Sequence, residues 1–269
     1  MIRNEGDTMR RVIVVPPVTE YSNIGDLERH NFRSIPDASA AREQHDRLCR
    51  LLESFDIEVI HLPELSGHPN SVFVRDVAVV TPQGAVLMSM GLESRRGEEA
   101  WIENHLESLG LPVVARVIPP ATAEGGDVIL AGDIAFVGHS TRTNEVGADQ
   151  VARILLNMGY RVRITDIPEP FLHIGGAMSI IAPDKVICTA GVFPKKFFQG
   201  FETITVPDSG FSSGNVITVK PNEIIVHAAG AETVELLREH SIIVHDIDLS
   251  AFLSGTGGPS CLILPVERN

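Results

Sequence analysis

Short apolar runs and polar turns alternate along the chain in a unit that recurs. Each unit starts with small or glycine-rich residues and continues with two Val/Ile-rich segments joined by a Pro, Gly or Asp turn. A stretch with apolar residues every three or four positions follows, and one more apolar segment closes the unit. Apolar alternation between turn residues predicts strands, and the wider spacing predicts a helix with one buried face. Each unit is therefore predicted to fold as ββαβ.

Five copies of this unit can be traced. The four internal copies start at Ser71, Glu124, Ile174 and Ser212, and the third has a shortened middle. The fifth is split, because residues from Gly257 onward supply one strand while VIVVPP, AAREQHDRLCRLLESF and IEVIHLPEL near the N-terminus supply the rest. A unit that borrows strands from the other end of the chain predicts a closed ring, which also removes exposed sheet edges. We expect a five-bladed α/β propeller around a central channel.

A closed ring brings the starts of its units together at one end of the channel. Ligand sites in folds of strands and helices gather at strand ends. We therefore expect one site, built from polar residues at these starts although they are far apart in the sequence. The expected neighbours are Asp76, Glu124, Asp127, His173 and Cys261.

The ring is expected to span residues 11–269 as a single domain. Residues 1–10, MIRNEGDTMR, are polar and lack the apolar core of a signal peptide, so we expect a flexible leader. No apolar run approaches the roughly 20 residues that span a bilayer. The chain has three cysteines and no CxxC pair, which disfavours a disulfide framework or a structural metal site and favours a reducing compartment. A cytoplasmic enzyme without metal or cofactor is expected.

The formal net charge is −13 with 43% hydrophobic residues, which is typical of an acidic globular protein. Nucleic acid and anionic membrane surfaces would be repelled, so both are poor candidates for partners. A small cation would meet a favourable field. The charge therefore favours a cationic small molecule as ligand. A homodimer remains open.

Cys261 and His173 are the candidates for covalent chemistry. Cys261 in GTGGPSCLIL follows glycines that allow close backbone approach or a positive φ, and it starts an apolar strand. His173 in PFLHIGG starts the third unit. The alternatives are a small buried thiol and a histidine bonded to a backbone carbonyl. Cys49 and Cys188 lie within an amphipathic helix and an apolar strand, where packing explains them.

Charged residues mark the other unit starts. Glu124 and Asp127 flank two glycines in AEGGDVIL, where a carboxylate could orient a histidine, bind a cation or cap a turn. Asp76 in FVRDVAVV opens a Val-rich strand, although strands are depleted in Asp. Arg95 and Arg142 each follow a strand and precede a helix, which suits either a carboxylate ligand or a solvated charge.

These segments together resemble the guanidino-modifying enzymes, which include dimethylarginine dimethylaminohydrolases, arginine deiminases and amidinotransferases. SVFVRDVAVV, SRRGE, EGGDV, FVGHSTRTNEVGA, LHIGG and GGPSCLILP occur in family order over almost the whole chain, and dimethylargininases are the most similar branch. The resemblance implies a five-bladed α/β propeller and hydrolysis of a substituted guanidine, such as dimethylarginine, through a covalent thiouronium. It also implies the following roles: Cys261 as nucleophile, His173 as acid/base, Glu124 orienting His173, Asp76 binding the guanidinium, Arg95 and Arg142 binding the substrate carboxylate, and Phe73 as an apolar wall. Asp127, at the repeat position of Asp76, is added as a further substrate-binding candidate.

Three positions depart from the family pattern. Dimethylargininases carry acidic residues where this chain has Asn70 and Arg75, and deiminases carry an Asp where it has Gly175. A second carboxylate for the guanidinium is therefore missing. Methylarginine, arginine and other guanidines remain open as substrates. Amidino transfer to an amine and a binding protein without catalysis remain open as functions.

Overall fold

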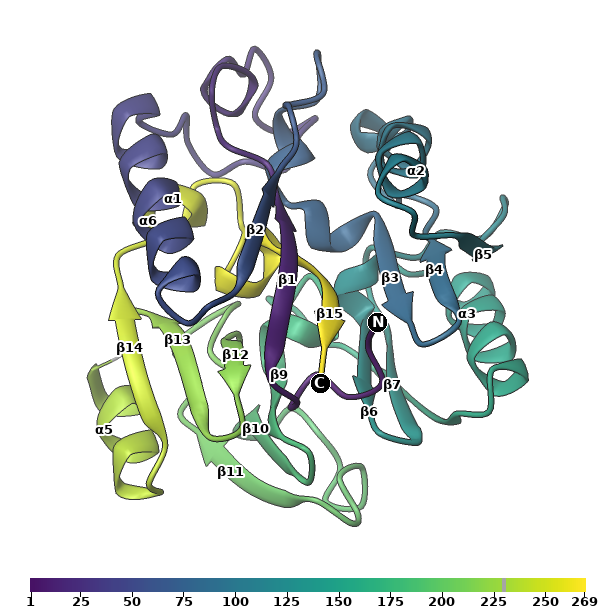
Figure 1. Ribbon diagram of the computed structural model, residues 1–269, viewed down its shortest axis with the longest axis vertical. Coiled ribbons are helices and arrows are strands. Elements are labelled where there is room, and N and C mark those ends of the chain that lie inside the picture. Colours follow the sequence, from purple (N-terminus) through teal and green to yellow (C-terminus); the bar gives the residue numbers. More distant parts are fainter. Residues whose placement is uncertain (229–230) are drawn as a thin grey trace.

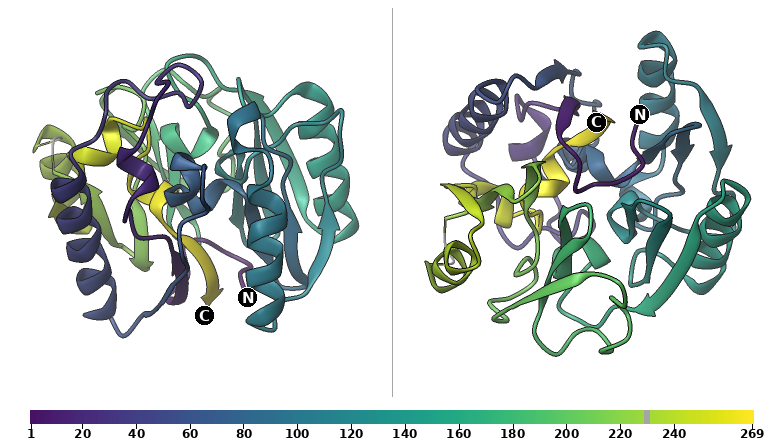
Figure 2. Two further views of the ribbon diagram at one scale, coloured as in Figure 1. Left: turned by 90° about the horizontal axis from the view of Figure 1, so that it is seen from above. Right: turned by 60° about the horizontal axis from the view of Figure 1, so that its bottom comes forward.

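The computed structural model describes residues 1–228 and 231–269. Its strands form five separate three-stranded sheets. Figures 1 and 2 show these sheets around a common centre, with the longer helices on the outside. In each sheet the first two strands of the unit are antiparallel and the third is parallel to the second. The predicted five-bladed α/β propeller is confirmed.

The sheets, each in the order of its unit, are these: β15 (Leu264–Arg268), β1 (Met9–Val14) and β2 (Glu58–His61); β3 (Ala78–Thr81), β4 (Gly84–Leu87) and β5 (Val113–Arg116); β6 (Val128–Ala131), β7 (Ile134–His139) and β8 (Arg161–Asp166); β9 (Met178–Ala182), β10 (Lys185–Thr189) and β11 (Glu202–Val206); β12 (Ile217–Lys220), β13 (Glu223–His227) and β14 (Ile243–Ile247). The crossover helices are α1 (Ala38–Glu53), α2 (Glu98–Ser108), α3 (Glu145–Asn157) and α5 (Ala231–Glu239). The sheet of β9, β10 and β11 has no crossover helix, as the shortened third unit predicted. A short helix, α6 (Ser250–Leu253), precedes the final unit.

The helices form where the sequence supplies a cap and an apolar face. Asp37 caps α1 by accepting a hydrogen bond from the Ala40 backbone N–H at 2.8 Å. Leu48 and Leu52 on its inner face are fully buried. Burial of one such side chain stabilises the fold by about 1.5–3 kcal/mol. This packing holds α1 against the outside of its sheet.

The last strand closes the ring by pairing with the first. β15 runs antiparallel to β1, with Met9 opposite Arg268, and the two chain ends lie near each other (Figure 1). The unit that is split between the termini is thus completed in space, as the repeat predicted.

The prediction of a flexible leader over residues 1–10 is wrong. Ile2 and Asn4 are buried. The Glu5 backbone N–H donates to Leu130 O at 2.8 Å, and Asn4 forms a β-bridge with Ala131. A Cβ on Gly6 would lie 2.3 Å from the Ala182 backbone, so glycine is needed for this close approach. The polar composition suggested solvent exposure, but these residues pack between β6 and β9.

Single helical turns lie at the starts of four of the five units, where the sequence indicated only small or glycine-rich residues. They are η2 (Pro69–Val72), η3 (Val74–Asp76), η5 (Gly125–Asp127), α4 (Ile174–Ala177) and η6 (Pro259–Leu262). Two further 3₁₀ turns, η1 (Glu20–Ser22) and η4 (Glu93–Arg95), lie in connecting loops. Residues of the turns at the unit starts line the two cavities described below.

Within the described residues, no helix combines the length and the apolar character needed to cross a bilayer. The cytoplasmic location and the homodimer stay predictions.

Candidate active site

Four unit starts bring the main candidate residues to one cavity. Asp76 ends η3, Glu124 precedes η5, His173 precedes α4 and Cys261 lies in η6. All four line a cavity that Arg142 also lines, and we call it the Arg142 cavity. The predicted gathering of these residues is confirmed, because the ring converts their equivalent repeat positions into neighbours.

Glycine permits the close packing of these groups. A Cβ on Gly126 would lie 2.8 Å from His173 Cγ and Nδ1 and 2.9 Å from Asp76 Oδ1. Contacts under 3.0 Å force a shift of the neighbouring atoms. The second glycine of AEGGDVIL is therefore required for the side chains of His173 and Asp76 to lie this close to its backbone.

His173 and Glu124 form a buried charged pair. His173 Nε2 lies 2.7 Å from Glu124 Oε2, and His173 Nδ1 lies 3.9 Å from Asp76 Oδ1. Burial alone would lower the pKa of His173, but Asp76 and the hydrogen bond with Glu124 outweigh it and raise that pKa. Burial likewise opposes ionisation of Glu124, while His173 and Arg142 hold the pKa of its carboxyl below the usual range. The imidazole is therefore protonated at neutral pH, and no hydrogen bond within the described residues occupies its Nδ1.

Cys261 lies beside His173 with its thiol protonated at neutral pH. Its backbone N–H donates to Gly258 O at 3.1 Å, which fixes the turn. Burial and the negative charge of Asp76 raise the pKa of the thiol to about 12, although Arg75 and Arg95 act in the opposite direction. A cation placed next to the sulfur would lower this pKa and favour the thiolate.

Two buried acceptor atoms on residues of the Arg142 cavity lack partners. Asp76 Oδ1 and Asn70 Oδ1 accept no hydrogen bond within the described part of the chain. Asn70 Nδ2 donates to His30 O at 3.1 Å, which orients the amide and leaves its oxygen as the acceptor. Unpaired buried acceptors are costly unless a ligand supplies donors. A planar cation with several N–H groups is complementary to this pair.

Arg95 lines the same cavity but is already engaged. It donates to Asp76 Oδ2 at 2.6 Å and to Phe73 O at 3.0 Å, and both Nε and Nη2 bond the Glu98 carboxylate. The guanidinium is 3% exposed. These contacts do not favour the predicted binding of a substrate carboxylate by Arg95, because its hydrogen-bonding groups already hold Asp76 in place. That role stays a prediction.

Arg142 has the guanidinium that remains available. Its closest carboxylate oxygen is Glu124 Oε1, at 3.6 Å, and its side chain donates no hydrogen bond within the described residues. Because its N–H groups face the cavity with unmet hydrogen-bonding capacity, Arg142 suits an anionic end of a ligand.

The hydrogen bonds of Asp127 do not favour its predicted role as a substrate-binding residue, which stays a prediction. Its carboxylate accepts hydrogen bonds from Ser140 Oγ and Thr143 Oγ1, both at 2.6 Å, and from the Ile174 backbone N–H at 2.8 Å. It is fully buried and lines neither cavity of the site. The repeat position that it shares with Asp76 suggested a shared role. Its hydrogen bonds instead fix the backbone next to His173.

Phe73 forms a wall of the Arg142 cavity, as predicted, and the glycines near Cys261 make room for it. A Cβ on Gly257 would lie 2.1 Å from the Phe73 ring. The residue with positive φ in this segment is Thr256, at 62°. The glycines Gly255, Gly257 and Gly258 thus serve close approach rather than a left-handed backbone.

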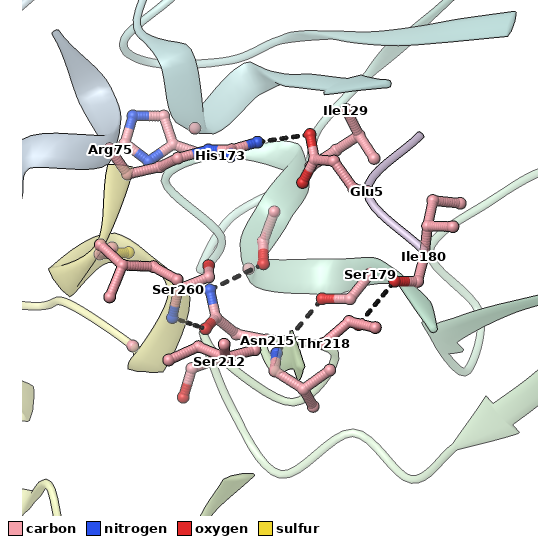
Figure 3. A pocket seen from close by; sticks show the side chains of 18 of the residues that line it. Glu5, Arg75, Ile129, His173, Ser179, Ile180, Ser212, Asn215, Thr218 and Ser260 are labelled. Carbon is pink, nitrogen blue, oxygen red and sulfur yellow. Dashed lines mark hydrogen bonds and ion pairs between the residues drawn. The ribbon is translucent and has the colours of Figure 1, made fainter. Parts of the chain in front are cut away.

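Sequence reasoning missed Glu98 and Asn215. Glu98 is fully buried and pairs with Arg95, and an acidic residue three positions after the arginine was the available signal. Asn215 donates to Gly175 O and accepts from the Ser260 backbone N–H, both at 2.8 Å (Figure 3). It thereby ties the turn after His173 to the turn of Cys261. Its position at the start of the fourth unit, in SSGNV, was the signal.

One group of side chains has the composition of a metal site. Asp76, Glu124 and His173 each offer a ligand atom, and these atoms lie within 4.8 Å of one another. However, Arg95 and Arg142 already offset the two carboxylates, and His173 is held as an imidazolium. These charges favour binding of a dispersed organic cation by the remaining acceptors over binding of a metal ion.

Comparison with known proteins places this geometry among enzymes of guanidino chemistry. The family model described as N,N dimethylarginine dimethylhydrolase, eukaryotic, matches residues 35–266. The N(G),N(G)-dimethylarginine dimethylaminohydrolase of Pseudomonas aeruginosa is 32% identical over 230 residues, covering 85% of this chain and 89% of that protein. The enzyme of the same name from Streptomyces coelicolor is 29% identical, covering 88% and 90%.

Solved structures agree with this placement. The Pseudomonas aeruginosa enzyme in complex with citrulline superimposes with a TM-score of 0.85 at 28% identity, covering 96% of this chain and 99% of that one. An amidinotransferase from Microseira wollei has a TM-score of 0.84 at 17% identity, covering 100% and 97%, and this likeness shows the fold alone.

Proposed function

The chain belongs to the family of N,N-dimethylarginine dimethylhydrolases, and from this premise we propose that it hydrolyses N-methylated arginine with Cys261 as nucleophile. The family makes it a hydrolase acting on guanidino C–N bonds. The products of the proposed reaction are citrulline and the methylated amine. The substrate and the roles of the individual residues are proposals, and they rest on the cavity geometry.

One observation carries the proposal: two unpartnered buried acceptors, Asp76 Oδ1 and Asn70 Oδ1, line the cavity of Cys261 and His173. A guanidinium donates to both at once, and a neutral ligand of the same shape with fewer N–H groups does not. Asn70 therefore retains the acceptor of the acidic residue that it replaces, without its charge. Arg95 fixes Asp76 by binding its other oxygen.

The proposed chemistry starts when the guanidinium binds. Its positive charge offsets Asp76 and lowers the pKa of the Cys261 thiol, which loses its proton to solvent. The thiolate forms a bond to the central guanidinium carbon, and the C–N bond to the methylated nitrogen breaks. His173 Nδ1 donates its proton to the departing amine.

Hydrolysis of the covalent intermediate uses the same histidine. His173, now neutral, takes a proton from water as the water oxygen bonds to the thiouronium carbon. The C–S bond then breaks, and the ureido product leaves with Cys261 restored. Glu124 stabilises the imidazolium throughout, and Arg142 binds the substrate carboxylate.

The test is an assay of ureido product with dimethylarginine, monomethylarginine, arginine and simple guanidines. We expect turnover of a methylated arginine that falls by at least about 10³-fold in Cys261→Ala, because the covalent route is lost. Cys188→Ala is the matched control, since Cys188 is a buried cysteine of β10 that lines neither cavity. It should retain activity.

An unchanged rate in Cys261→Ala would rule out Cys261 as nucleophile. Turnover of arginine in preference to its methylated forms would replace the proposed substrate and leave the mechanism standing. A folded protein that gives no product from any guanidine would favour a binding protein on this fold.

A further inference from the structure

A second cavity adjoins the first behind the catalytic pair. Its lining includes Glu5, Arg75, Ser179, Thr218 and Arg268, and we call it the Arg268 chamber. Figure 3 labels the first four of these residues. His173 and Cys261 line both cavities. Its free volume of about 40 Å³ is room for roughly three water molecules, at 10–15 Å³ each. A group attached to the far side of a guanidinium at Cys261 would therefore enter this chamber.

Arg268 is a buried cation that forms no ion pair within the described residues, although the negative charges of Glu5 and Asp7 favour its protonated form from a longer distance. It is 8% exposed, and its Nη1 donates to the backbone oxygens of Asp7 and Thr218 at 2.6 and 2.9 Å. Its Nε has no hydrogen-bond partner, and no carboxylate oxygen within the described residues lies within 4.0 Å of the guanidinium. Burial lowers its pKa to about 10. Because buried arginines are nearly always paired, this one indicates an anionic ligand.

Arg75 adds a second positive charge to the same wall. It bonds Glu5 Oε1 at 2.6 Å and Val128 O at 3.0 Å through Nη2. Glu5 Oε1 also accepts from the Leu130 backbone N–H at 3.1 Å. In Figure 3 Arg75 extends from beside His173 to Glu5. Two guanidinium groups thus share one carboxylate, that of Glu5, among the residues that line the chamber.

We propose that the Arg268 chamber binds the carboxylate of a small amine that leaves, or attacks, the carbon held by Cys261. This inference rests on the proposed function and extends it to the group on the far nitrogen. Departure of an amine from the carbon bonded to Cys261 and attack of an amine on that carbon are the two directions of one step. The amine therefore occupies the same place in both. The shared chemistry is therefore a short amino acid, with its nitrogen at His173 and its carboxylate toward Arg268.

Each version of the step is balanced without a further reagent. When the amino acid is part of the substrate, the S–C bond forms, the C–N bond breaks, and the amine takes a proton from His173. When a free amino acid is the acceptor, its neutral amine gives a proton to His173 as the C–N bond forms and the C–S bond breaks. The first route ends in hydrolysis and the second in transfer of the amidino group.

A competing explanation is that Arg75 and Arg268 serve only as counter-ions of the Cys261 thiolate. The two explanations differ in how they treat reagents of different charge. A counter-ion raises the thiolate fraction, and through that fraction it accelerates every alkylating reagent by the same factor. A carboxylate site accelerates only a reagent that carries a carboxylate.

Alkylation of Cys261 by iodoacetate and by iodoacetamide makes this distinction without requiring turnover. In both reactions the S–C bond forms and iodide leaves, so the ratio of the rates at one pH cancels the thiolate fraction. We expect the ratio of iodoacetate to iodoacetamide to exceed that of free cysteine by about tenfold and to return to it in Arg268→Gln. The double variant Glu5→Gln/Arg75→Gln, which leaves no unpaired carboxylate, should lower the ratio as well. Arg161→Gln, which removes an exposed arginine of β8, should leave it unchanged.

A wild-type ratio no higher than that of free cysteine overturns the inference, and so does a ratio that Arg268→Gln leaves unchanged. Either result leaves the proposed hydrolysis intact, because alkylation does not depend on it.

The reaction products then decide whether the carboxylate belongs to a leaving group or to an acceptor. Faster release of ureido product from Nω-carboxymethylarginine than from Nω-methylarginine identifies the leaving group. Guanidinoacetate from arginine and glycine identifies an acceptor. If the protein turns over dimethylarginine but neither releases ureido product faster from Nω-carboxymethylarginine nor forms guanidinoacetate, the chamber does not bind the carboxylate of an amine, and the proposal is overturned.

Discussion

Neighbouring charges set opposite proton affinities on two adjacent residues. Burial and, next to it, Asp76 raise the pKa of the Cys261 thiol to about 12, and Asp76 also raises the pKa of the His173 imidazolium. The negative charge opposes a thiolate and favours an imidazolium. His173 is therefore ready to donate a proton, whereas the Cys261 thiol ionises appreciably at neutral pH only when a cation binds next to it. Substrate charge would supply that cation, which favours covalent chemistry at neutral pH with guanidinium-like ligands over uncharged ones.

The rate of Cys261 alkylation should therefore rise with pH in the protein by itself. Because the raised pKa keeps the thiolate fraction small at pH 7, the rate with iodoacetamide should climb about tenfold per pH unit and show no plateau below pH 9. Mass spectrometry after timed labelling measures this rate. Labelling of Cys261→Ala reports the contribution of Cys49 and Cys188. A plateau below pH 8 would mean that the thiolate already exists without substrate.

The element that carries Cys261 depends on side chains packed against bare backbone. Gly257 faces the Phe73 ring, and Gly258 lies against Asn215, whose amide bridges the turns of His173 and Cys261. The GTGGPSC segment therefore fixes the nucleophile and shapes the cavity wall together. Its glycines could be recognised from sequence as tolerant of close approach, but the rings and amides that approach them could not.

Gly257→Ala should displace Phe73 and weaken both stability and substrate binding. The added methyl group would lie 2.1 Å from the ring, and overpacking of this kind destabilises proteins by about 1–3 kcal/mol. Denaturant unfolding measures the first effect, and KM for the substrate, which should rise more than kcat falls, measures the second. Gly25→Ala is the control, because no atom lies within 4 Å of its added Cβ. Equal behaviour of the two variants would contradict the packing role of Gly257.

Across the whole molecule, ring closure makes the two ends of the chain part of the core. Residues 2–7 pack between β6 and β9, Glu5 pairs with Arg75, and the backbone oxygen of Asp7 receives Arg268. The N-terminal segment thus covers one end of the channel, and the candidate site lies toward the unit starts. Loss of this segment would leave two buried guanidinium groups without their partners.

Removal of residues 1–7 should lower the melting temperature by roughly 6–20 °C. Breaking a buried ion pair costs about 3–5 kcal/mol, and each kcal/mol corresponds to about 2–4 °C in a chain of this size. Thermal unfolding followed by circular dichroism measures the change. Glu5→Gln removes the ion pair with Arg75 but keeps the packing of Ile2 and Asn4. This variant should show part of the decrease in melting temperature. An unchanged melting temperature in the truncated protein would mean that this segment adds no stability.

The sequence alone determined the repeat, the closed ring and the gathering of Asp76, Glu124, His173 and Cys261. Periodicity is a local property, and a split unit implies closure, so equivalent positions must meet. The tertiary structure decided which partner each charge takes. Arg95 turned out to hold Asp76, Asp127 to support the backbone at His173, and Glu5 to enter the channel. Such pairings join residues that are distant in the sequence, as far as 70 positions for Glu5 and Arg75 and 261 positions for Asp7 and Arg268. They follow from competition among buried groups for hydrogen bonds, which spacing along the chain does not encode.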